Sequence, residues 1–409
     1  MRLFVRYMTV TTWLLFLVIS LQAQTSPTKQ PAQTTPPTLE DFWEGQAIWS
    51  LAVFDVGLPV GESDTIAMSD GSYWSYLHAS HQSAGVIDQC GDPVAFPGCL
   101  TRWESTDGGE TFTLPAQVCT ISCQQCPCDD ERDHHGVTPQ GTRAAAQQYP
   151  RVAQTDDGTF YMVYEWRAQT MLRTSPDGLN WSDWTRLITP AGTWHTDNFP
   201  CTETERIGPH PFIQGEVHNC LVGAPPGIYL DGDMIYVFVA AGSAPGHMRC
   251  YKGQRDMLDN LQRCDTDPLF AGADTYGPVD VIGPAANAFF DFRYVSSAEV
   301  MRVGDHYYMA YEGIRGPEEL EIGRDTQFAL GFARSTGPQI DGPWEKFAGN
   351  PVIEDIGFNW GIGHADLIVI DGVTYMYTTT SIDVEYAADG REIISAGGTR
   401  GRYRLDWID

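Results

Sequence analysis

The sequence predicts an all-β protein, a five-bladed β-propeller with a disulfide-rich loop insertion. Two observations carry the prediction: a strand–turn–strand unit recurs along the chain, and two turns follow a pattern typical of propellers. The clearest unit spans residues 363–377, with an apolar first strand at 367–370 and an Asp371-Gly372 pair before the return. β-branched residues favour strands, and Asp-Gly supplies the positive φ that a two-residue hairpin needs.

Four earlier copies of the unit indicate a supersecondary repeat. They begin at Ser63, Tyr149, Pro225 and Ser297. The copies lie roughly 70 residues apart, with a longer first gap, which is the spacing of a repeated supersecondary unit. Five units predict five blades; an all-β sandwich with similar hairpins is the alternative.

The first 40 residues are expected to lie outside the fold. Residues 1–23 have the composition of a secretory signal peptide, with Arg2 and Arg6 before a short apolar stretch at 13–21. Residues 24–40 are rich in Pro, Thr and Gln, which is typical of a disordered linker. We therefore expect a secreted, extracellular protein.

The folded domain is expected to span residues 41–409. Its first part, 41–56, is apolar and predicts a strand that closes the propeller against the C-terminus, because closure removes exposed sheet edges. After the signal peptide, no stretch is long and apolar enough to span a membrane. We expect a monomer.

The charge balance excludes several kinds of partner. Asp and Glu number 53 against 25 Lys and Arg, which gives a formal net charge of −28. Such a surface repels nucleic acid and anionic membranes, so a neutral or cationic partner is favoured.

The ten cysteines all come after the signal peptide. An even number of cysteines in an exported protein predicts disulfides. The easiest local pairs are Cys90–Cys99, Cys201–Cys220 and Cys250–Cys264. The insertion at 119–141 holds four cysteines before an acidic run and two histidines, so it predicts a disulfide-stapled loop or a zinc site, and secretion favours the disulfides.

Two turns have the Asp-box pattern, Ser-x-Asp-x-Gly-x-Thr-aromatic, that many propellers carry between outer strands. Residues 105–112 fit the pattern, and residues 175–181 are a near relative. Asp and Gly serve the turn, and the aromatic residue packs between sheets. The pattern therefore indicates a fold, not a chemistry.

Propeller topology predicts which polar residues meet. The start of each innermost strand and the end of its antiparallel neighbour lie at the same rim of the central channel. The first set comprises Asp64, Arg151, Glu299, His364 and Asp366. The second set comprises His78, Glu165 and Glu312, with Trp166 and Tyr311 close by.

Carboxylates that converge in this way suit glycoside hydrolysis. One carboxyl group must be protonated to donate to the leaving oxygen, and another must be ionised to activate water or attack carbon. Crowding of like charges raises one pKa and separates the roles. The alternative is structural: the acids accept from strand-end amides or pair with Arg151, Arg293 and Arg315.

From Asp64 to the C-terminus, the repeat resembles the five-bladed propeller glycoside hydrolases of families 43 and 32. The resemblance implies that Asp64 is the general base and Glu299 the general acid. It also implies an axial cation, usually calcium, near Gly363-His364, so that His364 is the expected metal residue. Three Arg at successive blade heads, which sialidase chemistry requires, are not present.

The chain departs from the family pattern at several positions. Thr65 stands after the predicted base where the family has Pro, and Val300-Met301 stand after the predicted acid where the family has Gly-Pro. The third blade carries Ala224-Pro225-Pro226 where an Asp should tune the acid, and Asp291 or Glu312 are the possible substitutes.

We therefore predict a secreted glycoside hydrolase that cleaves neutral poly- or oligosaccharides with Asp64 and Glu299. The residues expected to bind substrate or tune pKa values are Arg151, Glu165, Trp166, Asp291, Glu312 and Asp366. A non-catalytic carbohydrate- or protein-binding propeller is the alternative, supported by the missing third-blade Asp. A structural surface protein with a stapled rim is the third hypothesis.

Overall fold

The computed structural model describes most of the β-structure of the chain. The described residues are 35–59, 61–78, 100–115, 147–166, 169–183, 185–187, 206–210, 213–218, 226–241, 247–258, 261–265, 268–270, 290–291, 294–314, 328–354, 362–386 and 393–408. Residues 1–35 and 36–409 form two separate units, and every described strand belongs to the second unit. The predicted signal peptide, the insertion at 119–141 and the pairs Cys90–Cys99 and Cys201–Cys220 lie outside the described residues.

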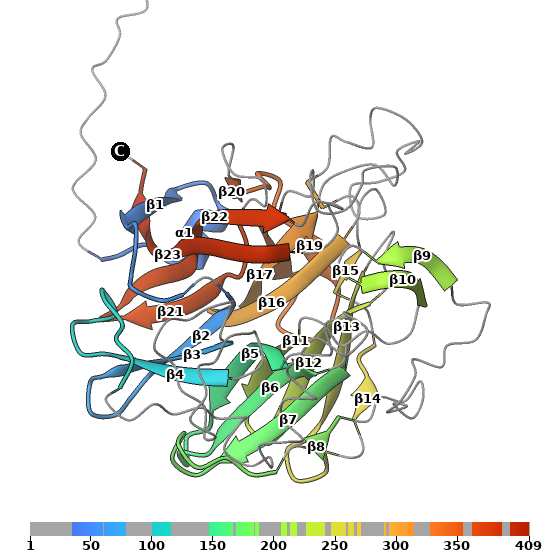
Figure 1. Ribbon diagram of the computed structural model, residues 1–409. Helices are drawn as coiled ribbons and strands as arrows, with labels where there is room; N and C mark the ends of the chain where they lie inside the picture. Colours follow the sequence, from blue (N-terminus) through green and yellow to red (C-terminus); the bar gives the residue numbers. More distant parts are fainter. Residues whose placement is uncertain are drawn as a thin grey trace, which may run out of the picture. The chain divides into compact units, whose positions relative to one another are not determined.

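Five antiparallel sheets form five blades, as predicted (Figure 1). Blade I holds β2 (Ser63–Ala67), β3 (Tyr73–His78) and β4 (Leu100–Ser105). Blade II holds β5 (Gln147–Gln154), β6 (Phe160–Trp166), β7 (Gln169–Ser175) and β8 (Thr185–Arg186). Blade III holds β11 (Pro226–Asp231), β12 (Met234–Ala241), β13 (His247–Gln254), β14 (Gln262–Arg263) and β15 (Leu269–Phe270).

The last two blades complete the ring. Blade IV holds β16 (Tyr294–Val303), β17 (His306–Ile314), β18 (Phe328–Ser335), β19 (Trp344–Lys346) and β20 (Ile353–Glu354). Blade V holds β21 (Asp366–Ile370), β22 (Val373–Tyr386), β23 (Ile393–Trp407) and β1 (Ala47–Val53). A separate pair, β9 (Arg206–His210) and β10 (Ile213–His218), lies between blades II and III in the sequence.

The innermost strands of the five blades close a ring around the axis. In order, β2 contacts β5, β5 contacts β11, β11 contacts β16, β16 contacts β21, and β21 contacts β2. Apart from the outer strand β1 of blade V, each innermost strand is the first of its blade along the chain, and the strand starts gather at one face of the ring. This face therefore receives the polar residues that precede or begin the strands.

Blade V is closed by both ends of the folded unit. The N-terminal strand β1 pairs antiparallel with β23, with Ala47 opposite Trp407 and Leu51 opposite Tyr403. This pairing confirms the prediction that residues 41–56 close the propeller. On the inner side of β1, Trp49 is buried and stacks on Phe332 of blade IV, with 5.8 Å between the ring centroids.

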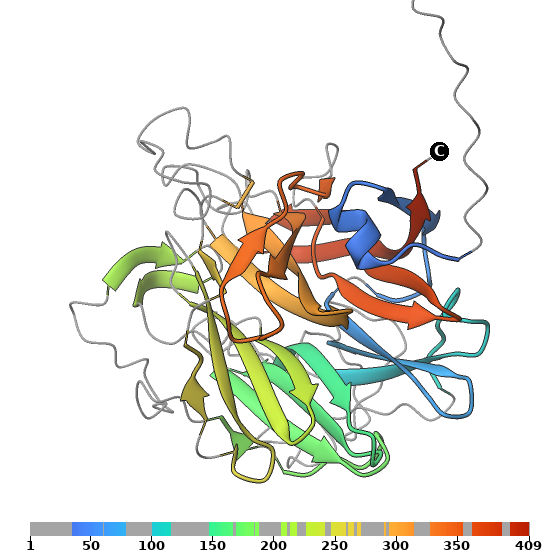
Figure 2. The same cartoon turned by 180° about the vertical axis from the view of Figure 1, so that it is seen from behind.

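A short helix, α1 (Leu39–Trp43), precedes this strand and begins two residues before the expected start of the domain. Thr38 caps it: its hydroxyl accepts from the Asp41 amide, and the Asp41 carboxylate accepts from the Thr38 amide. Leu39 and Phe42 are buried in the core shared by blades IV and V, where Figure 2 shows the blue helix against orange and red strands.

The two Asp boxes form the predicted turns. Asp107 accepts hydrogen bonds from the amides of Glu110 and Thr111, each 3.0 Å long. Asp177 accepts from the amides of Leu179 and Asn180 at 2.8 and 2.7 Å. Both turns thus use a carboxylate to satisfy strand-end amides that would otherwise lack a partner.

Each Asp box also accepts a hydrogen bond from the preceding blade in the ring. The Tyr377 hydroxyl of blade V donates to the Gly109 carbonyl of blade I at 2.7 Å, and the Tyr76 hydroxyl of blade I donates to the Gly178 carbonyl of blade II at 3.1 Å. In the second case Trp181 packs edge-on against the ring of Tyr76, with centroids 5.7 Å apart.

Among the described residues the structure holds one disulfide, the predicted Cys250–Cys264 pair of blade III. In the same part of the chain, no helix has the length and apolar character needed to cross a membrane.

Replacing Trp49 by Ala should lower the free energy of unfolding by about 3–5 kcal/mol, because the change leaves a cavity where blades IV and V meet. Urea unfolding measures the loss. Leu51→Ala is the control, since Leu51 lies on the same strand with 47% of its surface exposed. Equal stability of the two variants would contradict the view that β1 is held by its inner face.

Candidate active site

Four innermost strands each bring two side chains, spaced two residues apart, into one cluster on the axis. In blades II and IV a register shift between the first two strands lies at this position, and in blades I and V the first residue of the pair precedes its strand. The pairs are Glu62 and Asp64 of blade I, Tyr149 and Arg151 of blade II, Ser297 and Glu299 of blade IV, and His364 and Asp366 of blade V.

Arg151 is the centre of this cluster. Its fully buried guanidinium donates to the Ser63 carbonyl and the Ser297 hydroxyl, both at 2.9 Å. Its Nε lies 3.5 Å from Glu299 Oε2, and its Nη2 lies 3.9 Å from Glu62 Oε2. One cation thus links blades I, II and IV.

Three carboxyl groups with raised pKa values surround this guanidinium. Burial and the nearby charge of Asp366 raise the pKa of Asp64 to about 7. Burial and the charge of Asp64 raise the pKa of Glu299 well above its ordinary value, and burial raises the pKa of Asp366. The Val152 amide donates to Asp64, and the Thr65 hydroxyl donates to Asp366 at 2.6 Å.

A second group of acids lies beside His364. The Nδ1 atom of His364 is 2.6 Å from Glu62 Oε1 and 2.7 Å from Glu312 Oε1. The hydroxyls of Ser297 and Ser296 donate to Glu62 and Glu312 at 2.8 and 3.1 Å. Burial alone would lower the pKa of His364, but the two carboxylates raise it to about 9. His364 and Arg151 in turn outweigh burial and lower the pKa of Glu62 to about 2.

The backbone at His364 is held from two sides. A Cβ atom added at Gly363 would lie 2.2 Å from Glu312 Oε1, so only glycine lets this carboxylate approach. Arg400, fully buried on β23, donates to the His364 carbonyl at 2.9 Å and also to the Gly61 carbonyl. Burial lowers the pKa of Arg400 to about 10.

The structure brings six of the nine predicted site residues together in the axial cluster. The other three are Glu165, Trp166 and Asp291. The six are Asp64, Arg151, Glu299, Glu312, His364 and Asp366. Glu165 lies opposite Gln148 at the end of β6, the place that Glu312 takes opposite Ser296 on β17. The backbone of Trp166 ends β6, and its side chain is outside the described part.

The described contacts of Asp291 are with residues outside the axial cluster. Its buried carboxylate accepts a hydrogen bond from Tyr311 at 2.9 Å and pairs with the buried ammonium of Lys346 on β19. Burial raises its pKa despite these partners. In this position it supports the strand that carries Glu312 rather than contacting the axial carboxyls in any described interaction.

Four residues of the cluster were not anticipated from the sequence: Glu62, Tyr149, Ser297 and Arg400. The signal for Glu62 was available, because it precedes Asp64 by two positions as His364 precedes Asp366. Ser297 precedes Glu299 in the same way. Nothing in the local sequence marks Arg400, which reaches the site from the third strand of blade V.

The residues near His364 suit the expected cation. The carboxylates of Glu62 and Glu312 and the imidazole of His364 each offer one ligand atom, and these atoms lie within 4.8 Å of one another. Carboxylate oxygens are the ligands that calcium prefers. The carboxylates of Glu62 and Glu312 therefore fit the axial cation that the family resemblance implies, and His364 would join them as a ligand only after losing the proton that the two acids favour.

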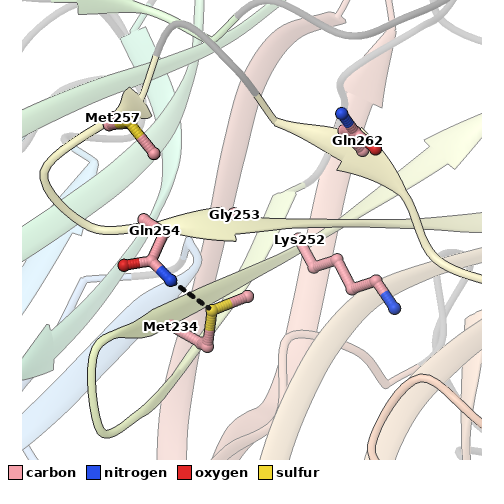
Figure 3. A pocket seen from close by; sticks show the side chains of 6 residues that line it. All are labelled: Met234, Lys252, Gly253, Gln254, Met257 and Gln262. Carbon is pink, nitrogen blue, oxygen red and sulfur yellow. Dashed lines mark hydrogen bonds between the residues drawn. The ribbon is translucent and has the colours of Figure 1, made fainter.

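A separate surface pocket lies on blade III (Figure 3). It has a volume of about 200 Å³ and is lined by Met234, Lys252, Gly253, Gln254, Met257 and Gln262. Met234 pairs with Asp231 at the end of β11, so the pocket lies toward the face opposite the strand starts. It has no carboxylate lining and is not the site of acid–base chemistry.

The comparisons with known proteins give fold neighbours only. No protein-family profile and no curated protein matches the sequence. An α-L-arabinofuranosidase of Podospora anserina in complex with cellotriose is similar in structure, with 13% identity, a TM-score of 0.49, and 88% of this chain and 96% of that chain covered.

Two further solved structures are similar at the same level. An α-L-arabinanase of Cellvibrio cellulosa complexed with arabinohexaose has 15% identity and a TM-score of 0.45, covering 86% of this chain and 93% of that chain. An endo-1,4-β-xylanase from Bacteroides thetaiotaomicron has 12% identity and a TM-score of 0.43, covering 88% and 97%. All three are named as glycoside hydrolases, the class that the repeat resembles, but similarity this low carries no argument about activity.

Replacing Asp64 by Asn should stabilise the protein at pH 7. Between about pH 4 and 7 the folded state keeps the Asp64 proton that the unfolded state has released, so stability falls as pH rises. Asn removes this titration and can still accept from the Val152 amide. The gain at pH 7 should be on the order of 2–4 kcal/mol and vanish near pH 4.

Urea unfolding at several pH values measures this gain. The control is Asp305→Asn, because Asp305 is an exposed carboxyl in the turn between β16 and β17. A gain that does not depend on pH, or a loss at pH 7, would be inconsistent with a raised pKa at Asp64.

Proposed function

We propose that the protein is a secreted, monomeric glycoside hydrolase that cleaves neutral poly- or oligosaccharides by carboxylate acid–base catalysis. The observation that carries the proposal is the pair of carboxyls of Asp64 and Glu299, which interact with the buried guanidinium of Arg151 and have raised pKa values. A hydrolase of this class needs one protonated and one ionised carboxyl at neutral pH.

The environments of the two groups assign their roles. Burial and the charge of Asp64 raise the pKa of Glu299 well above its ordinary value, so Glu299 is assigned the role of general acid. Asp64 ionises near pH 7 and accepts from the Val152 amide, so it is the base that activates water or attacks carbon. The 14% exposure of the Glu299 side chain is consistent with access to a leaving oxygen.

Other residues hold or bind without reacting. Arg151 orients Glu299 and offsets the charge that develops on the pair. Asp366 adds a like charge beside Asp64 and so tunes its pKa. Glu312 holds His364, Asp291 supports the strand of Glu312, and Glu165 and Trp166 contribute to substrate binding from the equivalent strand end of blade II.

The substrate is a neutral sugar chain. Its hydroxyl groups suit the carboxylates and serine hydroxyls of the axis, whereas an anionic sugar would meet a chain of formal net charge −28. Calcium, held by the carboxylates of Glu62 and Glu312 beside His364, would supply positive charge that offsets the charge of the two carboxylates.

A carbohydrate-binding propeller without catalysis is the second candidate. One observation favours it: among the described residues, β11 begins with Pro226 and Gly227 and brings no carboxyl group to the axis. The place that a Cβ of Gly227 would take is filled by the Ala298 carbonyl of the neighbouring strand. No described residue of blade III is therefore an acid that would tune Glu299.

The purified mature protein should release sugar from a panel of aryl-glycosides and neutral polysaccharides. Glu299→Gln and Asp64→Asn should each lower kcat by about 10²–10⁴-fold, because each removes a proton-transfer group. Reducing-sugar release and chromatography measure the product. The control is Glu345→Gln, an exposed glutamate of β19.

If the Glu299→Gln variant still releases sugar, the protein is a hydrolase but Glu299 is not its general acid. Binding of sugar by the wild-type protein without release of product would favour the second candidate.

Chelation should weaken the fold around His364. Treatment with EDTA should lower the melting temperature by several degrees, and calcium should restore it, since a ligand that binds only the folded state stabilises it. Scanning calorimetry measures the shift. Glu312→Gln, which removes one proposed ligand, should abolish the response. If elemental analysis finds no calcium and EDTA has no effect on the untreated protein, the calcium proposal is wrong.

A further inference from the structure

Three non-glycine residues at the axis have backbone conformations that such residues rarely adopt. Their φ angles are 54° at Tyr149, 56° at Ser297 and 64° at His364. The left-handed region is unfavourable for residues with a Cβ, and more so for a bulky aromatic residue. Residues held in this region cluster at sites where the strain serves a function. Ser297 and His364 have such a role in the hydrogen-bonded cluster, so Tyr149 calls for one too.

Tyr149 and Ser297 occupy equivalent β-bulges. In blade II the register of β5 and β6 shifts between Gln148 and Arg151, and in blade IV the register of β16 and β17 shifts between Ser296 and Glu299. Bulges next to active sites re-aim side chains. A β-bulge therefore lies at the equivalent position of the innermost strand in blades II and IV.

The contacts of the two bulged residues show where each side chain goes. The Ser297 hydroxyl reaches the axis, where it donates to Glu62 and accepts from Arg151. The Tyr149 ring reaches the same cluster and lies 5.9 Å from the imidazole ring of His364, at an angle of 40°. Ser297 is fully buried, whereas Tyr149 is partly exposed. Tyr149 thus offers an aromatic surface beside the carboxyls and Arg151.

We propose that the Tyr149 ring is the platform on which a sugar ring of the substrate stacks at the axis. This inference rests on the proposed function and adds a residue that sets substrate binding. A sugar ring has an apolar C–H face and a rim of hydroxyl groups. The Tyr149 ring would pack against the C–H face, and the carboxyls and Arg151 would hydrogen-bond to the hydroxyl groups. Binding sites commonly divide these contacts between aromatic and polar groups in this way.

The test measures binding without turnover. In the Glu299→Gln background, calorimetry titrates neutral xylo- and arabino-oligosaccharides, and Tyr149→Phe, Tyr149→Ala and Tyr149→Gly are each added. Phe should keep affinity within about twofold, because the ring is retained. Ala and Gly should weaken binding by at least about tenfold, or 1.4 kcal/mol. Tyr236→Ala, on the second strand of blade III, is the control for loss of a partly buried tyrosine.

Glycine separates a platform from a structural role. It adopts positive φ readily, so Tyr149→Gly relieves the backbone and should melt no lower than Tyr149→Ala. A platform predicts lost affinity in a protein that remains as stable, and in the active enzyme a raised KM with a smaller change in kcat. A residue that only supports the fold would lose stability and affinity together, and that result overturns the proposal.

The remaining outcomes distinguish this proposal from the hydrolase. Sugar release by the wild type with an unchanged KM in Tyr149→Gly overturns the platform and keeps the enzyme. Binding that depends on Tyr149 without sugar release by the wild type upholds the platform and overturns hydrolysis. Absence of binding across both sugar series overturns both.

Discussion

A buried guanidinium is the constraint on which the axis depends. Five carboxyl groups, from Glu62, Asp64, Glu299, Glu312 and Asp366, lie within the described cluster with little access to water. Isolated buried charges are costly, and they persist only when they are paired and hydrogen-bonded. Arg151 supplies positive charge to Glu62 and Glu299 of blades I and IV, and His364 does so for Glu62 and Glu312 of the same two blades. Burial raises the pKa of Asp366 of blade V, and the nearby charges of Arg400 and Arg151 oppose that rise. The unequal sharing of these cations is what separates the pKa of Glu62 from those of Asp64 and Glu299.

Neighbouring blades are tied by a repeated contact away from the axis. Aromatic residues that come after a turn pack edge-on against the second strand of the preceding blade: Phe112 on Tyr377, Trp181 on Tyr76, and Trp344 on Phe238. The first two belong to Asp boxes, and the third comes after Asp341-Gly342-Pro343 in a turn of a different pattern. The geometry of the inner ring can therefore be held from the outside, so the axial residues can be chosen for charge rather than for packing.

Local patterns in the sequence were sufficient to predict the fold and half of the site. Hairpin turns such as Asp371-Gly372 and the recurring strand pairs predicted five blades, and the similar places of Asp64 and Glu299 before their hairpin turns predicted that they would meet. The structure differs in one respect: Glu299 lies within β16, after a bulge, and not at its start. The contacts of Arg400 and Asp291 could not be predicted, because each partner comes from a distant segment, as in the pairing of Asp291 with Lys346. The bulge at Tyr149 is equally invisible in sequence, since it is a property of the register between two strands.

The pairing of β1 with β23 affects the order in which the protein folds during synthesis. Ala47 and Trp407 are partners, so blade V lacks its outer strand until a segment 360 residues further along the chain has been made. Contacts between such distant residues form slowly, because a long loop must close first. During synthesis the ring of the four earlier blades stays open, and the edge of β1 is exposed to other chains. The axial cluster draws on blades I and V, so the site is assembled only in the last step of folding.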